Sequence, residues 1–429
     1  MLKKVLLPLI ICTAILSACS EQPAITAATF TPQPAEPEIA TPSAPTAAAP
    51  TAAAPQPTPV DNPVSLTLTQ LRMIDAPNGW AVGRAPGDIN DRILRTSDGG
   101  ATWRDATPPG ALQNSPAAGL AAAASFFDLA HAWVLYTPRT WETTAQNPVV
   151  WRTSDGGVTW QASELPLKGL IMKNFEQPRL GFVDWQNGFL FAHIGREAER
   201  DFIVLMTTND SGVTWKPVVS TSNSTLPLSG EKNGASFISA QTGWITGSYN
   251  GASTGLFFWR TRDGGLTWQR QIIDPPDGMP ADLFVNEAVN CTAEPPQFFP
   301  DQGGVMRVSC SSNTFEQPQS WVYVSFDEGQ TWDPRQVPGP NGTLNFISPY
   351  QGWYLGPVQT GDETKNKILA TADSGLTWTP VTPVMWSGEL VFLTPQVGWG
   401  LVNLNGARAV VKTTNGGFVW AELRAMLLP

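Results

Sequence analysis

From residue 64 onward, short apolar runs alternate with turns rich in Gly, Pro, Asp and Asn, and no segment keeps a sustained helical period. The alternation comes in blocks that repeat along the chain. Runs of strand length that are bounded by turn residues favour antiparallel strands joined by tight turns. We therefore expect residues 64–429 to form a single all-β domain built from repeated units.

The most regular part of each block is an eight-residue turn, which we call the clip, with the pattern Ser/Thr-x-Asp-x-Gly-x-Thr-Trp. Successive clips begin between 42 and 64 residues apart, a spacing typical of propellers and solenoids. The Asp is suited to accept backbone N–H bonds, the Gly allows a positive φ, and the Trp can cover the neighbouring sheet. We interpret the clip residues as structural, without catalytic or calcium-binding roles. They are Asp98, Trp103, Asp155, Trp160, Asp210, Trp215, Asp263, Trp268, Asp327, Trp332, Asp373, Trp378, Asn415 and Trp420.

A second element precedes each clip by about twenty residues and consists of an apolar residue, four variable residues, a small residue and an aromatic. In the fifth block Val305 replaces the aromatic. This spacing predicts a first strand, a tight turn and a second strand, and a third strand then leads into the clip. Four antiparallel strands repeated seven times predict a seven-bladed β-propeller with one clip per blade. Residues 117–124 are the one place where a short helix or a loop is expected.

The clip resembles the Asp box, or BNR repeat, of sialidases, some endo-glucanases and sortilin-type receptors. A Gly-Trp strand comes before it, as in Gly79-Trp80-Ala81-Val82-Gly83. With this strand, residues 64–429 are similar to the photosystem II assembly and stability factors of the WD40/YVTN/BNR-like superfamily. The resemblance implies the propeller fold and a partner-binding role. The basic surface by which the photosynthetic members are thought to grip their client cannot be placed on this chain residue by residue.

The N-terminus has the form of a bacterial lipoprotein signal in residues 1–19, with two Lys, an apolar segment and the lipobox Leu16-Ser17-Ala18-Cys19. Cys19 is then the lipidated residue, and residues 20–63 form a disordered Pro/Ala/Thr-rich tether. We expect an exported protein that is anchored by lipid to the outer face of the plasma membrane or to the outer membrane.

Composition and charge bear on three further properties, which are nucleic-acid binding, disulfide formation and metal binding. The formal net charge of −10 and the pI near 4.8 argue against nucleic-acid binding. In an oxidising compartment Cys291 and Cys310 are expected to form a disulfide in the fifth blade. The two His, His131 and His193, fall in different blades, so the sequence predicts no metal site and no cofactor.

Long irregular loops between the second and third strands, and between blades, are predicted to share the face opposite the clips. Binding residues concentrate in such loops, and six side chains are candidates for a binding face. They are Arg139, Trp141, Arg196, Arg200, Tyr249 and Trp386.

For function, the sequence favours a monomeric, non-catalytic propeller that binds a protein partner, as an assembly factor or scaffold for an envelope or membrane complex. The alternative is a cell-surface protein that binds carbohydrate or hydrolyses it in the manner of a sialidase. The Arg-Ile-Pro motif of sialidases and a phosphate-binding loop are absent, and no carboxylate pair stands out. A carbohydrate site should show a carboxylate pair and exposed aromatics in a central depression, whereas a protein-binding face should be broad.

Overall fold

The structure is a computed structural model that describes residues 63–428 apart from 114, 141–147, 169, 171–173, 199, 222–223, 250–254, 314 and 362. The signal peptide, Cys19 and the tether up to residue 62 lie outside the described residues, and so does Trp141. The described residues form strands and turns, and none of them belongs to a helix that could cross a membrane.

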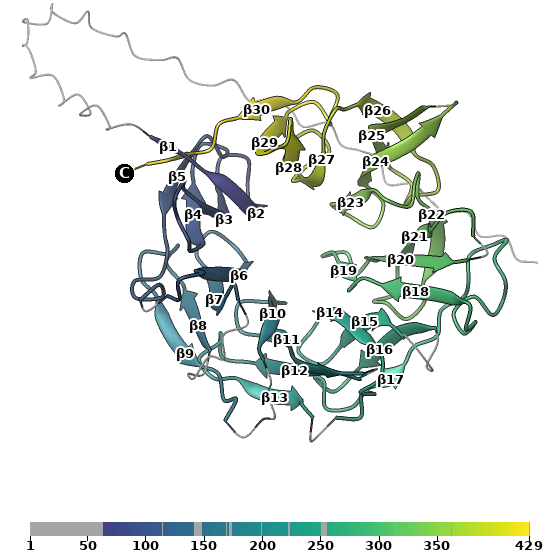
Figure 1. The fold of residues 1–429 in the computed structure, drawn as a ribbon, viewed down its shortest axis with the longest axis horizontal. Coiled ribbons are helices and arrows are strands. Elements are labelled where there is room, and N and C mark those ends of the chain that lie inside the picture. Colours follow the sequence, from purple (N-terminus) through teal and green to yellow (C-terminus); the bar gives the residue numbers. More distant parts are fainter. Residues whose placement is uncertain are drawn as a thin grey trace, which may run out of the picture. The chain divides into compact units, whose positions relative to one another are not determined.

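Seven antiparallel sheets follow one another around a ring, each built from consecutive strands, with the first strand of each sheet nearest the centre (Figure 1). The prediction of an all-β, seven-bladed propeller is therefore confirmed. In the fifth blade the first strand is divided into β18 and β19, which both pair with β20.

The strands are assigned to blades as follows. Blade one has β2 (Thr67–Met73), β3 (Gly79–Arg84), β4 (Arg92–Thr96) and β5 (Thr102–Asp105), and blade two has β6 (Leu120–Phe126), β7 (Ala132–Pro138), β8 (Val149–Thr153) and β9 (Gln161–Glu164). Blade three has β10 (Glu176–Phe182), β11 (Gly188–Glu197), β12 (Arg200–Thr208) and β13 (Lys216–Val219), and blade four has β14 (Glu231–Phe237), β15 (Gly243–Ser248), β16 (Leu256–Thr261) and β17 (Gln269–Arg270). Blade five has β18 (Val289–Ala293), β19 (Gln297–Phe298), β20 (Gly304–Ser312), β21 (Gln319–Ser325) and β22 (Asp333–Gln336). Blade six has β23 (Thr343–Phe346), β24 (Gly352–Thr360), β25 (Glu363–Thr371) and β26 (Thr379–Pro383), and blade seven has β27 (Ser387–Phe392), β28 (Gly398–Leu404), β29 (Ala407–Thr413) and β30 (Ala421–Leu423).

Each clip joins the third strand of its blade to the fourth and is closed by its own hydrogen bonds. In the first clip the Asp98 carboxylate accepts bonds from the Thr96 hydroxyl at 2.9 Å, the Thr102 N–H at 2.9 Å and the Thr102 hydroxyl at 2.6 Å. The other Asp clips repeat these contacts, and in the last clip Asn415 still accepts the Val419 N–H at 2.9 Å. The clip carboxylates therefore hold the turn, as the sequence predicts, and their oxygens are occupied.

The clip also binds the turn between the first and second strands of the same blade. In blade one the Gly99 N–H donates to the Pro77 carbonyl at 2.8 Å, and corresponding bonds occur in all seven blades. Clips and first turns therefore lie at the same edge of every sheet. We call the surface that they form together the clip face.

Second-strand Trp residues tie neighbouring blades together. The Trp80 indole N–H donates to the Asp128 carbonyl of blade two at 2.8 Å, and Trp133 donates to the Ser211 carbonyl of blade three at 2.7 Å. The Arg95 guanidinium lies 4.2 Å from the Trp80 ring centroid, within cation–π range. The Trp399 indole makes the corresponding bond across the closure, from blade seven to Gly99 of blade one at 2.9 Å.

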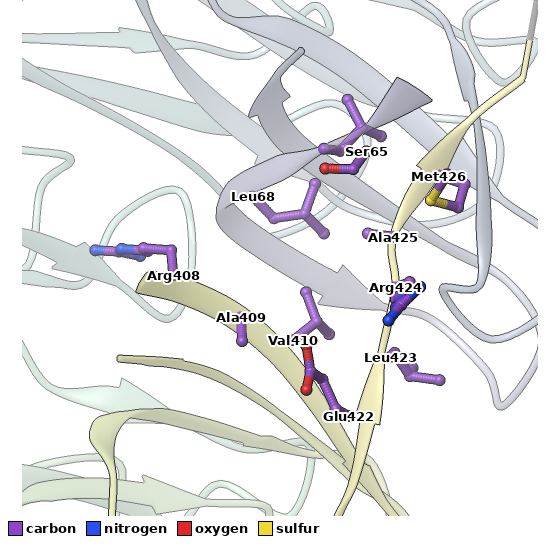
Figure 2. Close-up of a pocket in the computed structure, with 11 residues that line it drawn as sticks. Ser65, Leu68, Arg408, Ala409, Val410, Glu422, Leu423, Arg424, Ala425 and Met426 are labelled. Carbon is purple, nitrogen blue, oxygen red and sulfur yellow. The ribbon is translucent and has the colours of Figure 1, made fainter. Parts of the chain in front are cut away.

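The ring is closed by the two ends of the propeller at the outer edge of blade one. The C-terminal strand β31 (Met426–Leu427) pairs in parallel with β5, and β1 (Val64–Ser65) pairs antiparallel with β31. The seam between β2 and the strands β29 and β30 contains a groove of about 370 Å³, into which Leu68 and Val410 project (Figure 2). The four main strands of every blade are consecutive in sequence, so no blade is completed by a main strand from the other end of the chain. The closure is held by β31, by the Trp399 bond, and by apolar packing of Leu68 and Leu71 against Leu401 and Val410.

Two sequence expectations about local structure have different outcomes. The short helix or loop expected at 117–124 is wrong, because residues from Leu120 to Phe126 form β6, the innermost strand of blade two. That strand pairs with β7 over its whole length, and its Ala124 carbonyl accepts a bond from Gln70 of blade one. The disulfide is confirmed, since Cys291 and Cys310 face each other in β18 and β20 and are joined.

Candidate functional site

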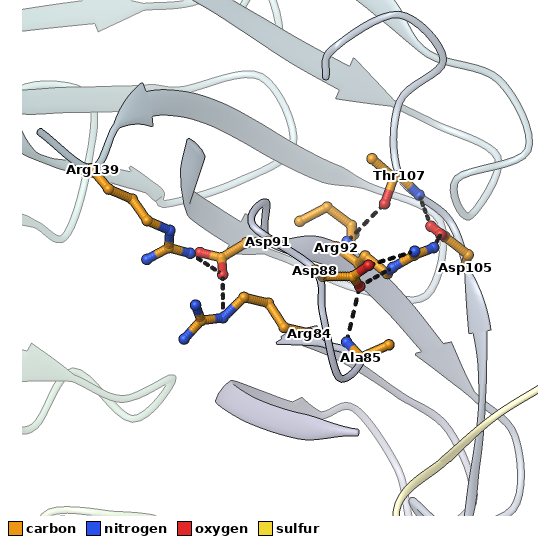
Figure 3. A network of polar contacts seen from close by, with 9 residues as sticks. Arg84, Ala85, Asp88, Asp91, Arg92, Asp105, Thr107 and Arg139 are labelled. Atoms are coloured by element: carbon orange, nitrogen blue, oxygen red, sulfur yellow. Dashed lines mark hydrogen bonds and ion pairs between the residues drawn. The ribbon is translucent and has the colours of Figure 1, made fainter. Parts of the chain in front are cut away.

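Two of the six candidate binding residues have structural roles. Arg139 reaches from blade two to the buried Asp91 of blade one, which also contacts Arg84, as Figure 3 shows. Trp386 is buried and packs edge-on against Trp420 at a centroid distance of 5.6 Å. The expectation that Trp386 is available on a binding face is therefore wrong, because the residue is buried. Arg139 is exposed, although one end of its guanidinium is held by Asp91.

Two other candidates belong to one long hairpin. Arg196 and Arg200 are exposed at the tip of the β11–β12 hairpin, on the side of the ring away from the clips.

Tyr249 is half-buried, with its ring 5.1 Å from that of Phe257, and its hydroxyl accepts a bond from Trp259. Arg196 lines a cavity together with other charged residues.

That cavity, which we call the inner cavity, has a volume of about 530 Å³ and lies among the inner strands of blades three to five. β10, β11 and β14 form its walls, and the segment after β18 completes them. The polar lining consists of Gln177, Arg179, His193, Arg196, Glu231, Asn233 and Glu294. Leu180, Phe189 and Ala235 supply its apolar part.

Three β-bulges converge on this cavity. They lie between Glu176 and Arg179 in β10, between His193 and Gly195 in β11, and between Lys232 and Gly234 in β14. In the first bulge Gln177 has a φ of 47°, a left-handed value that is uncommon for a residue with a side chain. Bulges redirect side chains and recur beside functional sites, and left-handed non-glycine residues cluster there as well.

A buried ionic network lies beneath the cavity. His193 Nδ1 is 2.8 Å from Asp201 Oδ1, and Asp201 Oδ2 accepts the Lys232 backbone N–H at 2.8 Å. Burial opposes the charge of Asp201, but the bonds from His193 and Lys232 outweigh it and keep the Asp201 pKa below its usual value. The carboxylate orients the imidazole, so the neutral ring carries its proton on Nδ1 and offers Nε2 as an acceptor.

The Lys232 ammonium is enclosed by backbone carbonyls. The three N–H donors of Nζ are shared among the carbonyls of Asp201, Leu228, Ser229 and Gly230 at 2.8 to 3.1 Å, and the residue is 1% exposed. Burial lowers the pKa of Lys232 from 10.5 to about 8. The ammonium therefore fixes the connection between β13 and β14 that supports the cavity wall.

This burial predicts a dependence of stability on pH. Between pH 8 and 10.5 the unfolded chain binds more protons at Lys232 than the folded chain, so the free energy of unfolding contributed by this residue rises with pH. Between pH 7.5 and 11, we expect the free energy of unfolding of wild type to rise by about 3 kcal/mol relative to that of Lys232→Met. Urea unfolding of both proteins at several pH values measures the difference. A difference that stays constant with pH would contradict the burial of a charged ammonium.

Charges of both signs lie at the mouth of the cavity. Arg196 forms an ion pair with Glu231 at 3.0 Å. Arg179 and Glu294 are exposed, and within the described part of the chain neither side chain has a hydrogen bond or ion pair. The site therefore presents an unpaired guanidinium and an unpaired carboxylate beside the oriented imidazole of His193.

Sequence reasoning identified the neighbourhood of this site and missed most of its residues. Arg179, Glu231, Asn233 and Glu294 stand in strands and connections with ordinary composition, so no motif marks them. A usable signal was present in Gly195 and Gly234, since Gly inside a strand pattern indicates a bulge. Among the described residues, no group of three or more His, Cys, Asp or Glu is arranged to hold a metal ion.

Comparison with known proteins shows that the chain is similar to several solved structures in its fold. No protein-family profile matches the chain, and no curated sequence matches it. Among solved structures it is similar to the GH74 xyloglucanase from Xanthomonas campestris, with 13% identity, a TM-score of 0.49, and coverage of 86% of this chain and 55% of that one. A polysaccharide lyase of family PL25, an ulvan lyase, gives 11% identity and a TM-score of 0.47 over 86% and 93% of the two chains. The β-propeller domain of the trilobed protease from Pyrococcus furiosus gives 6% identity and a TM-score of 0.47 over 84% and 98%. At these values the similarity concerns the propeller fold alone.

Proposed function

We propose that the protein binds carbohydrate in the inner cavity without hydrolysing it. The observation that carries this proposal is the composition of the cavity wall, which combines guanidinium, amide, carboxylate and imidazole groups with an apolar part at Phe189. A sugar hydroxyl both donates and accepts hydrogen bonds, so it is suited to a wall that offers both kinds of partner. The concave shape and the convergence of three bulges support binding at this point.

The residues that line the cavity include neither a free carboxylate pair nor an exposed Trp or Tyr, the two features expected of a carbohydrate site from the sequence. Binding without hydrolysis is favoured because the carboxylates do not form a catalytic pair. A glycosidase of the usual kind needs one carboxyl as general acid and a second as nucleophile or base. Both oxygens of Asp201 are occupied and its pKa is lowered, while Glu231 is bound to Arg196. Glu294 is left as a single unpaired carboxylate, which suits recognition of a hydroxyl group.

The second candidate function is binding of a protein partner in the envelope or at the membrane, as an assembly factor or scaffold. The observation that favours it is a set of exposed aromatic side chains on the clip face, among them Trp185 and Tyr350. The resemblance of the clips to Asp boxes, and of the whole repeat to photosystem II assembly factors, is consistent with this role.

A glycan microarray probed with the full-length protein tests the carbohydrate proposal. We expect wild type to bind a defined set of oligosaccharides and Arg179→Gln to bind them at least tenfold more weakly, since a hydrogen bond to a charged group contributes about 1.5 to 3 kcal/mol. Arg104→Gln is the matched control, because Arg104 is also exposed but lies on the outer strand of blade one. Failure of wild type to bind any glycan, or equal binding by both variants, would contradict the proposal.

We also propose that the chain is exported and anchored by lipid on Cys19. Cys19→Ala is expected to release the protein from the membrane fraction after export, because the acyl chains would be lost. Fractionation of host cells followed by immunoblotting measures the distribution. Full retention of the variant in membranes would show that another contact holds the protein there.

A further inference from the structure

The clip face carries an unusual share of the apolar side chains that are exposed to solvent. The sixth residue of the clip points outward and is a large apolar residue in five blades, as Val158, Val213, Leu266, Leu376 and Phe418. The first turns add aromatics, of which Trp185 is half exposed, and Tyr350 stacks on Phe326 at 5.3 Å. Most of the exposed large apolar residues in the described part of the chain belong to this face. Apolar residues scattered singly are ordinary on a protein surface, whereas here they recur at one position around the ring and share one face with the exposed aromatics of the first turns.

The position is exposed for a structural reason. In each clip the fifth residue is a Gly that turns the chain, and the eighth is a Trp that packs inward. The Thr at the seventh position binds the Asp carboxylate, for example Thr159 to Asp155 at 2.6 Å. The sixth side chain is therefore left outside the turn, and nothing in the clip itself requires it to be apolar.

The clip face is also negatively charged. The clip face consists of the seven clips and the seven first turns. The first turns are residues 74–78, 127–131, 183–187, 238–242, 299–303, 347–351 and 393–397. These segments contain eleven carboxylates and one guanidinium, that of Arg262. Four further cations, Arg95, Arg152, Arg260 and Lys412, directly precede clips, and Arg95 and Arg260 donate to carbonyls of neighbouring clips. Eleven negative and five positive charges leave the face with a formal charge of −6. Four of the carboxylates, those of Asp75, Asp128, Asp184 and Asp301, belong to the first turns.

This charge persists over a wide range of pH. The hydrogen bond from Thr159 and the bonds from neighbouring groups lower the pKa of Asp155 to about 2. In the other five Asp clips burial raises the pKa of the Asp, but hydrogen bonds from the clip Thr and its neighbours lower it by more. The pKa of each of these Asp residues therefore also lies below its usual value. The face is therefore anionic under all physiological conditions.

From the exposed apolar ring and this charge, we propose that the clip face docks a cationic polypeptide surface that carries apolar anchor residues. Charge complementarity decides between occupants, because an anionic bilayer or a nucleic acid would be repelled by the carboxylates. A basic partner would be steered toward the face by the long-range field and held by apolar contacts with the sixth-position residues. This surface is distinct from the inner cavity, which opens among strand ends on the other side of the blades.

The test uses a synthetic 16-residue peptide of alternating Lys and Leu, titrated into the full-length protein and followed by fluorescence anisotropy of a dye on the peptide. We expect saturable binding that weakens steeply between 50 and 300 mM NaCl, because neutralised charges release counterions. A Glu/Leu peptide of the same length is expected not to bind.

A triple variant and a double variant test whether the peptide binds at the clip face. Val158→Ser/Leu266→Ser/Leu376→Ser removes three exposed anchors and is expected to weaken binding of the Lys/Leu peptide at least tenfold. Ile272→Ser/Met385→Ser is the matched control, since these side chains are 84% and 96% exposed but lie outside the clip face. Both variants should keep the wild-type melting temperature, because the changes are at the surface.

Three outcomes would overturn the proposal. The first is failure of the Lys/Leu peptide to bind at 50 mM NaCl, and the second is equal binding by the two variants. The third is binding of the full chain with Cys19→Ala to vesicles of phosphatidylglycerol and phosphatidylethanolamine that is lost in the triple variant. That result would make the clip face a membrane contact.

Discussion

Trp103→Ala is expected to lower the free energy of unfolding by about 4 kcal/mol, among the largest effects of any single substitution in this chain. The Trp103 side chain is fully buried, and its indole N–H donates to the Gly100 carbonyl at 2.9 Å. Trp103 also pairs with the closing strand β31, and the N–H of Leu428, which directly follows that strand, donates to the Trp103 carbonyl at 2.7 Å. Leu427 of β31 packs against the cluster that contains the Trp103 side chain. The substitution therefore removes core packing and weakens the closure of the ring at the same point.

Trp185→Ala is the control for this prediction, because Trp185 is half exposed and its loss should change stability by less than about 0.5 kcal/mol. Trp160→Ala should fall between the two, since Trp160 occupies the same clip position in blade two but is only half-buried. Urea unfolding followed by circular dichroism gives the three midpoints. Equal shifts for Trp103→Ala and Trp185→Ala would contradict the role assigned to the clip Trp in the closure.

Removal of the disulfide has the second large expected effect. Cys291 and Cys310 are 19 residues apart, and a loop of this length is expected to contribute about 3 kcal/mol by restricting the unfolded chain. Both residues are buried in a cluster that includes Trp321 and Leu283, so the double variant Cys291→Ala/Cys310→Ala keeps apolar groups in place.

The measurement is the melting temperature of wild type and double variant with and without a thiol reductant. We expect reductant to lower the melting temperature of wild type and to leave that of the double variant unchanged. A double variant as stable as oxidised wild type would show that the disulfide does not support blade five.

The repeat allowed the fold to be predicted because its signals are local. A clip needs its Asp, Gly and Trp within eight residues, so seven copies specify seven blades from sequence alone. The error at β6 arose because Ala favours helices in isolation, whereas Ala122 and Ala124 are held in a strand by pairing with β7 and packing near Trp80. The ring closure could not be predicted, since β31 has two residues and depends on contacts with β5 and β1 at the far end of the chain.

The candidate site was less predictable for the same physical reason. Arg139 and Trp386 are loop residues of functional type, but Arg139 binds Asp91 of blade one, and the Trp386 carbonyl accepts a bond from Asn366 of blade six. The inner cavity arises from bulges in three different strands, and a bulge changes the direction of a side chain without changing composition. Arg179 and Glu294 line the same cavity only when blades three, four and five are assembled.

Carbohydrate binding by the inner cavity is tested most directly by a crystal structure of the protein soaked with the oligosaccharide that binds best on the array. We predict sugar density in the inner cavity, with hydroxyl groups within hydrogen-bond distance of Arg179 and Glu294. An ordered sugar elsewhere on the propeller, with the inner cavity filled only by water, would contradict the proposed function.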